Sequence, residues 1–247
     1  MEVVFIGTGE AFNENRHNTS ILIDSKTKLL LDCGYNVPQS LWGYNLDPNF
    51  LDGAYISHFH ADHYFGLLPL ILRMEEDSRE KKFTVIGQKG VKEHILSSME
   101  LAWKGWSDLI RYTFKINFVE IKNSLNFNEL ELLFTSTSHA IPNYAIKVSA
   151  NSKSVCYSGD GAVTEDSKKL YNKSDLLVHE AYTIDTPIGG HETIRNLVRL
   201  TEEIKLNKLA IIHVMRNYLI QQETILQHFK GSSVEVFIPK ELQKIKL

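Results

Sequence analysis

The stretch 57–63 reads Ser-His-Phe-His-Ala-Asp-His, and it constrains the fold more than any other part of the chain. It places four metal-binding side chains within six residues, and these are His58, His60, Asp62 and His63. The apolar run Leu51–Ile56 predicts a strand before the stretch, and the apolar pattern of Tyr64–Glu75 predicts a helix after it. The period-2 spacing of His58 and His60 puts both imidazoles on one face of a strand end. Asp62 and His63 fall at the turn into the helix, so the cluster can address two different metal ions.

The chemistry of these ligands narrows the choice of metal. Imidazole and carboxylate groups without thiolate indicate zinc, with manganese or iron as alternatives. A polar surface turn that happens to contain three histidines is a much weaker explanation of the pattern. The two cysteines, Cys33 and Cys156, each follow apolar residues of a predicted strand. We therefore expect buried free thiols and no disulfide framework.

Composition and charge indicate an ordinary enzyme-sized protein. Of its 247 residues, 43% are apolar, and 27 basic against 30 acidic residues give a net charge of −3. Such a balance argues against strong general binding of nucleic acid. A strand is predicted from Glu2 onward, which leaves no room for a signal peptide. No apolar run reaches the length of a membrane span, so we expect no membrane contact and a cytoplasmic location.

Blocks of strands followed by blocks of helices occur twice along the chain. Further strands are predicted at Val3–Ile6, Thr19–Asp24, Lys28–Asp32, Phe83–Ile86, Leu130–Ser136, Tyr144–Ser149, Ser154–Ser158, Leu176–Val178, Lys208–His213 and Val234–Ile238. Further helices are predicted at Gly90–Trp103, Thr193–Ile204 and Gln222–Phe229. This order indicates two packed sheets with helices outside them. No segment has the composition of a linker, so we expect one domain over residues 1–247, with internal pseudo-symmetry.

Three more potential ligands stand just past predicted strands, and they are His139, Asp160 and His213. In layered α/β proteins, functional sites assemble at strand ends. Taken singly, each residue has an ordinary explanation as a loop histidine or a turn aspartate. The cluster at 58–63 still needs further ligands to complete two metal sites, and that need favours a ligand role for all three.

Motifs along nearly the whole chain resemble those of the metallo-β-lactamase-fold hydrolases, and specifically of their ribonuclease Z-like branch. The matching motifs are Gly7-Thr8-Gly9, Asp32-Cys33-Gly34, the stretch 58–63, Ser158-Gly159-Asp160, His179-Glu180-Ala181 and His191-x-Thr193. The resemblance implies an α/β fold, a four-layer αββα sandwich of two mixed β-sheets flanked by helices. It also implies a dinuclear zinc-dependent hydrolase that acts on phosphodiesters.

The resemblance implies a complete set of metal ligands. His58, His60 and His139 would hold one Zn²⁺, Asp62, His63 and His213 would hold the second, and Asp160 would bridge them. Two ions about 3.5–4 Å apart can share a hydroxide and direct it at phosphorus. Mn²⁺ or Fe²⁺ could take the place of zinc.

Catalytic and substrate-binding roles follow from the same resemblance. His191 would contact a phosphate oxygen and help to protonate the leaving alkoxide, and Glu180 would hold His191 in position. An alternative for Glu180 is a bond to a backbone or surface group. Asp62 could orient the water or move a proton. Asn18 and Thr19, after the first glycine-rich turn, are expected to contact substrate.

The chain also departs from authentic ribonuclease Z. That enzyme carries a long arm that clamps tRNA, whereas only twenty residues separate His139 from Asp160 here and two strands use them up. Gly161 replaces the usual Thr after the bridging aspartate, and Tyr182 replaces the usual Thr after the His-Glu-Ala run. We therefore expect a small phosphodiester, such as a cyclic nucleotide, or RNA as substrate. A tRNA 3′ endonuclease of the ribonuclease Z type is the alternative.

Three other classes fit less well. A flavodiiron-type oxidoreductase normally has Glu at the position of His60, and a true β-lactamase usually lacks the His191-x-Thr193 pattern. A non-catalytic metal-binding sensor with the same fold would usually have lost ligands, and none is missing. Relatives pair through helices that correspond to Tyr64–Glu75 and Gly90–Trp103, so a homodimer is expected.

Overall fold

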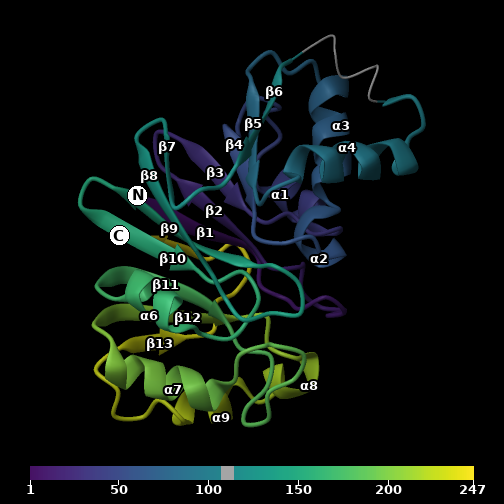
Figure 1. Cartoon of the computed structure of the whole chain (residues 1–247). Helices are drawn as coiled ribbons and strands as arrows, with labels where there is room; N and C mark the ends of the chain where they lie inside the picture. The colour runs from purple at the N-terminus through teal and green to yellow at the C-terminus, as the bar shows by residue number, and fades with distance from the viewer. Residues whose placement is uncertain (107–113) are drawn as a thin grey trace.

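The computed structural model in Figure 1 describes residues 1–106 and 114–247. Two β-sheets lie face to face, and each has seven strands among the described residues. The first sheet has the strand order β14-β1-β2-β3-β4-β5-β6. Its strands are β1 (Glu2–Gly7), β2 (Ser20–Asp24), β3 (Lys28–Leu31), β4 (Gly53–Ile56), β5 (Phe83–Gly87), β6 (Ile116–Glu120) and β14 (Lys244–Lys246).

The second sheet has the order β13-β12-β11-β10-β9-β8-β7. Its strands are β7 (Ser124–Phe127), β8 (Leu130–Ser136), β9 (Tyr144–Ala150), β10 (Lys153–Tyr157), β11 (Ser174–Glu180), β12 (Leu206–Ile212) and β13 (Glu235–Phe237). From β14 to β3 the first sheet is antiparallel, and from β3 to β6 it is parallel. The second sheet repeats this change between β7 and β13. The repeated topology confirms the predicted internal similarity.

Alternating side chains on β1 show how the sheets pack. Val3 and Phe5 point to the inner core between the sheets, while Val4 and Ile6 point to the helices outside the first sheet. The inner core joins the sheets directly, since the ring centroids of Tyr55 on β4 and Phe134 on β8 lie 5.6 Å apart. Burial of this apolar surface from both sheets drives their association.

Helices cover both outer faces, which confirms the predicted four-layer α/β sandwich (Figure 1). The first sheet is covered by α1 (Val37–Tyr44), α3 (Leu67–Glu76) and α4 (Val91–Ala102). The second is covered by α6 (Glu165–Tyr171), α7 (Ile194–Glu203) and α9 (Gln222–Gln227). Two single-turn helices, α2 (Ala61–Tyr64) and α8 (Arg216–Leu219), follow metal-ligand candidates in the chain. In the described part of the chain, no helix has the length and apolar character needed to cross a membrane.

The helix predicted over 64–75 is present as α3, which begins at Leu67, and Phe65 and Gly66 separate it from the short helix α2. The chain of Gly34 passes so close that a Cβ on Gly66 would lie 1.9 Å from the Gly34 carbonyl oxygen. Pro69 in the first turn of α3 has no N–H to donate to a preceding turn. The predicted helix is therefore confirmed except for its start, which lies at Leu67 instead of Tyr64, and the break leaves Asp62 and His63 on their own short turn.

Candidate metal centre

The candidate site is built at the carboxyl ends of strands from both sheets. Asp32 follows β3, the stretch 57–63 follows β4, and His139 follows β8. Asp160 follows β10, and His213 follows β12. Buried apolar strands thus carry each polar side chain to the same rim, where the two sheets meet. This is the position at which layered α/β proteins assemble their sites.

His58, His60 and His139 form one group of ligand atoms. The Nε2 atom of His58 lies 3.0 Å from Nδ1 of His60, and Nε2 of His139 lies 3.3 Å from the same atom. His58 is completely buried, whereas His60 and His139 are half-buried. Burial and the neighbouring His63 lower the pKa of His58 well below its ordinary value. The imidazole is therefore neutral, which is the form that binds metal.

Asp62, His63, Asp160 and His213 form the second group. Nε2 of His63 lies 3.3 Å from a carboxylate oxygen of Asp62 and 3.3 Å from one of Asp160. Nε2 of His213 lies 3.4 Å and 3.5 Å from the same two carboxylates. Burial alone would raise the pKa of the Asp160 carboxyl, but His213 and His63 hold it well below its ordinary value.

These spacings fit divalent metal ions. Ligand atoms about 2.0–2.1 Å from zinc at tetrahedral angles lie about 3.3–3.4 Å from one another, close to the distances within both groups. Asp160 belongs to the second group and also borders the first, because its Oδ2 atom, 3.5 Å from Nε2 of His213, lies 4.0 Å from Nε2 of His58. Nε2 of His63 and Oδ1 of Asp160 are buried and have no hydrogen-bond partner among the described residues. A metal ion would satisfy both atoms, whose burial without a partner is otherwise costly.

The carboxylate of Asp32 orients the ligand residues through hydrogen bonds. It accepts hydrogen bonds from the backbone N–H and the hydroxyl of Ser57, from Nδ1 of His63 and from the hydroxyl of Tyr157, at 2.6–2.7 Å. Because Nδ1 of His63 donates to Asp32, Nε2 carries the lone pair that faces the centre. Ser57 connects Asp32 to a second ligand. Its hydroxyl donates to Asp32, and its oxygen lies 3.0 Å from Nδ1 of His58.

Two residues of the centre have a left-handed backbone, which is unfavourable for residues other than glycine. Asp32 has a φ angle of 58°, and His213 has a φ angle of 54°. Such conformations cost about 1–3 kcal/mol each and persist where the surrounding structure holds them. For His213 the backbone N–H donates to the Thr8 carbonyl at 3.2 Å. The loop after β1 thereby fixes the chain at this ligand.

We expect Asp32→Asn to weaken metal binding by about 10–100-fold, the usual effect of removing a group that orients a ligand. The amide cannot accept the same four hydrogen bonds as a carboxylate, so the ring of His63 loses its fixed orientation. A competitive zinc titration with a chromophoric chelator measures this change. Asp175→Asn is the control and should leave the affinity unchanged. Asp175 lies at the start of β11, and the end of that strand that faces the candidate site is Glu180. Equal affinities of wild type and Asp32→Asn would exclude this role.

Glu180 and His191 lie beside the ligands. Oε1 of the fully buried Glu180 accepts hydrogen bonds from Nδ1 of His191 and from the backbone N–H groups of Gly161 and Glu192, at 2.9–3.0 Å. Nδ1 of His191 lies 3.9 Å from the Asp160 carboxylate. Burial lowers the pKa of His191, but the hydrogen bond and charge of Glu180 outweigh it and raise the pKa above its ordinary value.

The loop that carries Asp160 depends on two residues whose role the sequence did not suggest. The amide of Asn143 donates to the carbonyl oxygens of Ser158 and Asp160, and its oxygen lies 3.3 Å from the Asp160 nitrogen. Gly161 has a φ angle of 112°, and a Cβ there would lie 2.6 Å from the Thr137 hydroxyl oxygen. Glycine therefore suits both the backbone conformation and the space at this position.

Asn18 and Thr19 are both buried in the structure. The Thr19 hydroxyl donates to the Gly9 carbonyl at 3.1 Å, and the Asn18 amide nitrogen lies 3.5 Å from two carbonyl oxygens of the loop after β1. These bonds tie the glycine-rich loop to the start of β2. Oδ1 of Asn18 is buried without a partner among the described residues. Contact of either residue with substrate stays a prediction.

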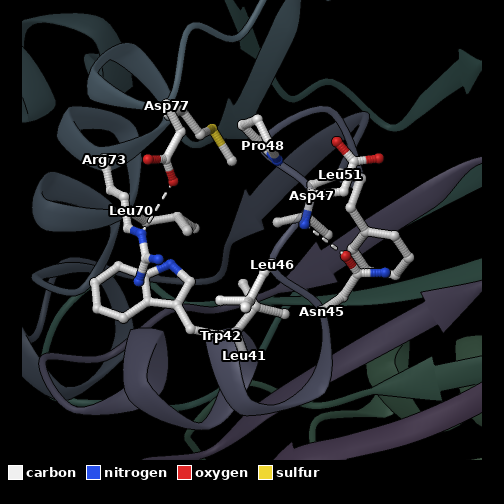
Figure 2. Close-up of a pocket in the computed structure, with 12 residues that line it drawn as sticks. Leu41, Trp42, Asn45, Leu46, Asp47, Pro48, Leu51, Leu70, Arg73 and Asp77 are labelled. Atoms are coloured by element: carbon white, nitrogen blue, oxygen red, sulfur yellow. Dashed lines mark hydrogen bonds and ion pairs between the residues drawn. The ribbon is translucent and has the colours of Figure 1, made fainter.

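Figure 2 shows a cavity of about 20 Å³ that lies between α1, α3 and the loop after α1. Its wall is mostly apolar, with Leu41, Leu46 and Leu70 among its residues. The guanidinium of Arg73 lies 4.5 Å from the Trp42 ring centroid. The volume would admit about one water molecule, and no metal-ligand candidate lines the cavity. It is a packing gap outside the candidate site.

Solved structures share this architecture. The metallo-β-lactamase fold protein YhfI from Bacillus subtilis superposes with a TM-score of 0.82 at 22% identity, over 99% of both chains. The short form of human tRNase Z superposes with a TM-score of 0.80 at 21% identity, over 100% of this chain and 99% of that one. These superpositions confirm the metallo-β-lactamase fold.

Proteins of similar sequence include ribonuclease Z from two archaeal species. Ribonuclease Z of Thermococcus sibiricus is 24% identical over an alignment that covers 100% of this chain and 96% of the relative. Ribonuclease Z of Methanocaldococcus jannaschii is 23% identical, with 88% of this chain and 87% of the relative covered. The predicted class, a metallo-β-lactamase-fold, ribonuclease Z-like hydrolase that depends on metal, is thereby confirmed.

Residues 1–230 match the model of the family described as Anti-Pycsar protein Apyc1. Because this match covers nearly the whole chain, the chain belongs to that family.

Proposed function

We propose that this protein is a dinuclear zinc-dependent phosphodiesterase that acts on a small phosphodiester or on RNA. The observation that carries the proposal is the presence of two neighbouring groups of ligand atoms, with Asp160 of the second group placed next to His58 of the first. One group is His58, His60 and His139, and the other is Asp62, His63 and His213. Manganese or iron would suit the same ligands.

Divalent ions at this site would act as Lewis acids on the phosphoryl oxygens and lower the pKa of a nearby water. Residues of the chain would orient the water and donate the proton. Asp62, with an exposed edge, would orient the attacking water. His191 would donate a proton to the leaving alkoxide from the ring nitrogen that Glu180 does not engage. Glu180 would fix the ring of His191 through its hydrogen bond to Nδ1.

The connection between His139 and Asp160 favours a small substrate. It consists of β9 and β10 joined at Asn151 and Ser152, and it leaves no room for a projecting arm. The alignment with the Thermococcus ribonuclease Z spans 302 residues against 247 in this chain, so that relative carries segments that are missing here. A tRNA 3′ endonuclease is the second candidate, since the sequence relatives bear the name ribonuclease Z.

A substrate panel tests the proposal. It contains bis(p-nitrophenyl) phosphate, cyclic nucleotides and a pre-tRNA with a 3′ trailer, each assayed with zinc-loaded protein. We expect turnover of small diesters that is lost after chelation and returns with added zinc. A well-folded, metal-loaded protein that hydrolyses none of these substrates would favour the non-catalytic sensor instead.

Salt dependence separates the two substrate classes. A protein that makes 6–10 phosphate contacts loses about 10³–10⁵ in affinity between 50 and 200 mM salt. A small diester offers about one such contact, so we expect its kcat/KM to fall by no more than about fourfold over this range. Pre-tRNA should be cleaved poorly at the higher salt. Efficient, site-specific trailer removal at 200 mM salt, with a higher kcat/KM than small diesters, would contradict the small-substrate proposal.

The homodimer and the cytoplasmic location stay predictions. The helices expected at the dimer contact are α3 and α4, which pack on the first sheet. Sedimentation velocity of the metal-loaded protein measures the oligomeric state directly.

A further inference from the structure

Tyr182 is a departure from the ribonuclease Z-like pattern that the proposed function leaves without a role. Its ring centroid lies 4.8 Å from that of His191, with an interplanar angle of 30°. It also lies 6.0 Å from the ring of His213. The rings of His191 and His213 are themselves stacked, 5.5 Å apart at 17°. Tyr182 therefore packs against His191 beside a metal-ligand candidate.

The backbone of Tyr182 is held on both sides of this stack. Its N–H donates to the Glu192 carbonyl at 3.1 Å, and its carbonyl accepts from the Met215 N–H at 3.0 Å. The first bond ties Tyr182 to the residue after His191, and the second ties it to the segment that follows His213. These two hydrogen bonds fix the backbone that carries the Tyr182 ring beside His191.

The ring, and not the hydroxyl, makes the observed contacts. Within residues 1–106 and 114–247 the Tyr182 hydroxyl makes no hydrogen bond. The charges of Glu10 and Arg216 act on the Tyr182 hydroxyl, but these two residues pair with each other. Arg216 donates to the buried Glu10 carboxylate at 3.0 Å. Stacked aromatic pairs are worth about 0.5–1.5 kcal/mol beyond the area that they bury. This is enough to bias a half-buried imidazole towards one orientation.

His191 needs such support, because a hydrogen bond at one ring atom leaves a rotation that only ring contacts, with Tyr182, His213 and His139, can restrict. The hydrogen bond from Nδ1 to Glu180 fixes one ring atom, but the ring can still swing about that contact. A face against Tyr182 restricts this rotation and so fixes the direction in which the other ring nitrogen points. We propose that Tyr182 is a positioning residue that holds His191 in its productive orientation by ring stacking. This inference rests on the proposed function, since it requires a reaction that depends on His191.

The test compares three variants on the zinc-loaded enzyme. Tyr182→Phe keeps the ring and should retain kcat within about threefold, because the stacking surface is unchanged. Tyr182→Leu removes the ring and should lower kcat about 10–100-fold for a dialkyl phosphate diester, whose alkoxide leaving group needs a proton. A loss of this size is expected for a misplaced catalytic group. Both variants should retain KM and metal content, and the melting temperature of Tyr182→Leu should fall by no more than about 6 °C. Phe65→Leu, an exposed ring that packs on Tyr64, is the matched control and should match wild type.

A double-mutant cycle shows whether Tyr182 acts through His191. In a His191→Ala background, Tyr182→Leu should cost no further activity, because the group that it positions is gone. The NOE contacts of the His191 imidazole with neighbours other than Tyr182 should change in Tyr182→Leu but not in Tyr182→Phe, independently of turnover. If Tyr182→Leu fails to fold, Tyr182→Met provides a second non-aromatic variant for the same measurements.

The outcomes separate the inference from the proposed function. Additive losses in the cycle, an equal loss in Tyr182→Phe, or unchanged NOE contacts of His191 in Tyr182→Leu would each overturn the positioning role. Wild-type protein that does not hydrolyse diesters, or full activity in His191→Ala, would instead overturn the proposed function.

Discussion

Replacing His63 with alanine is expected to lower phosphodiester hydrolysis by more than about a thousandfold. Charge stabilisation by a metal ion is worth several kcal/mol in a transition state, and each factor of ten in rate corresponds to about 1.4 kcal/mol. His63 joins Asp32 to the second ligand group, since its Nδ1 lies 2.7 Å from the Asp32 carboxylate and its Nε2 faces Asp160. Its loss should remove the second ion while leaving the first ligand group intact.

Elemental analysis and turnover of bis(p-nitrophenyl) phosphate check this result in the same preparation. His228→Ala is the matched control, because that imidazole is exposed near the end of α9. It should keep wild-type metal content and activity. A His63→Ala protein with full activity, or with an unchanged metal content, would rule out the assignment of this ligand.

Replacing His191 with alanine is expected to lower turnover by about two to four orders of magnitude, the usual range for acid–base catalysis. The metal content should remain normal, because two complete groups of ligands remain without this residue. The loss should be larger for a poor alkoxide leaving group than for p-nitrophenolate, which leaves without a proton. The comparison of two leaving groups in one variant therefore isolates proton donation.

Steady-state kinetics with matched alkyl and nitrophenyl esters measure this difference. If both esters lose activity equally, His191 positions the substrate or supports the structure and does not donate the proton. Glu180→Gln should give a smaller loss of the same kind, because the amide oxygen can still accept from Nδ1 of His191. Loss of metal in His191→Ala would place this residue among the ligands instead.

Strand ends made much of the site predictable from the sequence. His139, Asp160 and His213 each follow an apolar strand segment, and strand ends converge at one rim when the strands are parallel. The spacing within the stretch 57–63 supplied the remaining ligands. All seven predicted ligands lie together in the structure for this reason.

The supporting hydrogen bonds could not be predicted in the same way. Tyr157 reaches Asp32 across 125 positions of sequence, because β10 lies opposite β3 in the other sheet. Asn143 reaches the Asp160 loop from the start of β9. Such contacts depend on how the two sheets face each other, and no local pattern in the sequence carries that information.

The helices show the same limit. The apolar pattern over 64–75 continues through Phe65 and Gly66, so it predicts one helix. The break comes from the close approach of Gly34, which is distant in sequence. Helix α1 (Val37–Tyr44) was missed altogether, although Pro38 stands in its first turn, where proline is favoured. Its few apolar positions form too short a pattern for detection.

Metal titration of the apo protein tests the central claim most directly. Zinc is added in steps to protein stripped by a chelator, and bound metal and phosphodiester turnover are measured at every step. Two adjacent ligand groups bridged by Asp160, as proposed, predict that activity rises up to two equivalents per chain and then stops. Activity in metal-free protein, or full activity at a single equivalent, would contradict the dinuclear centre.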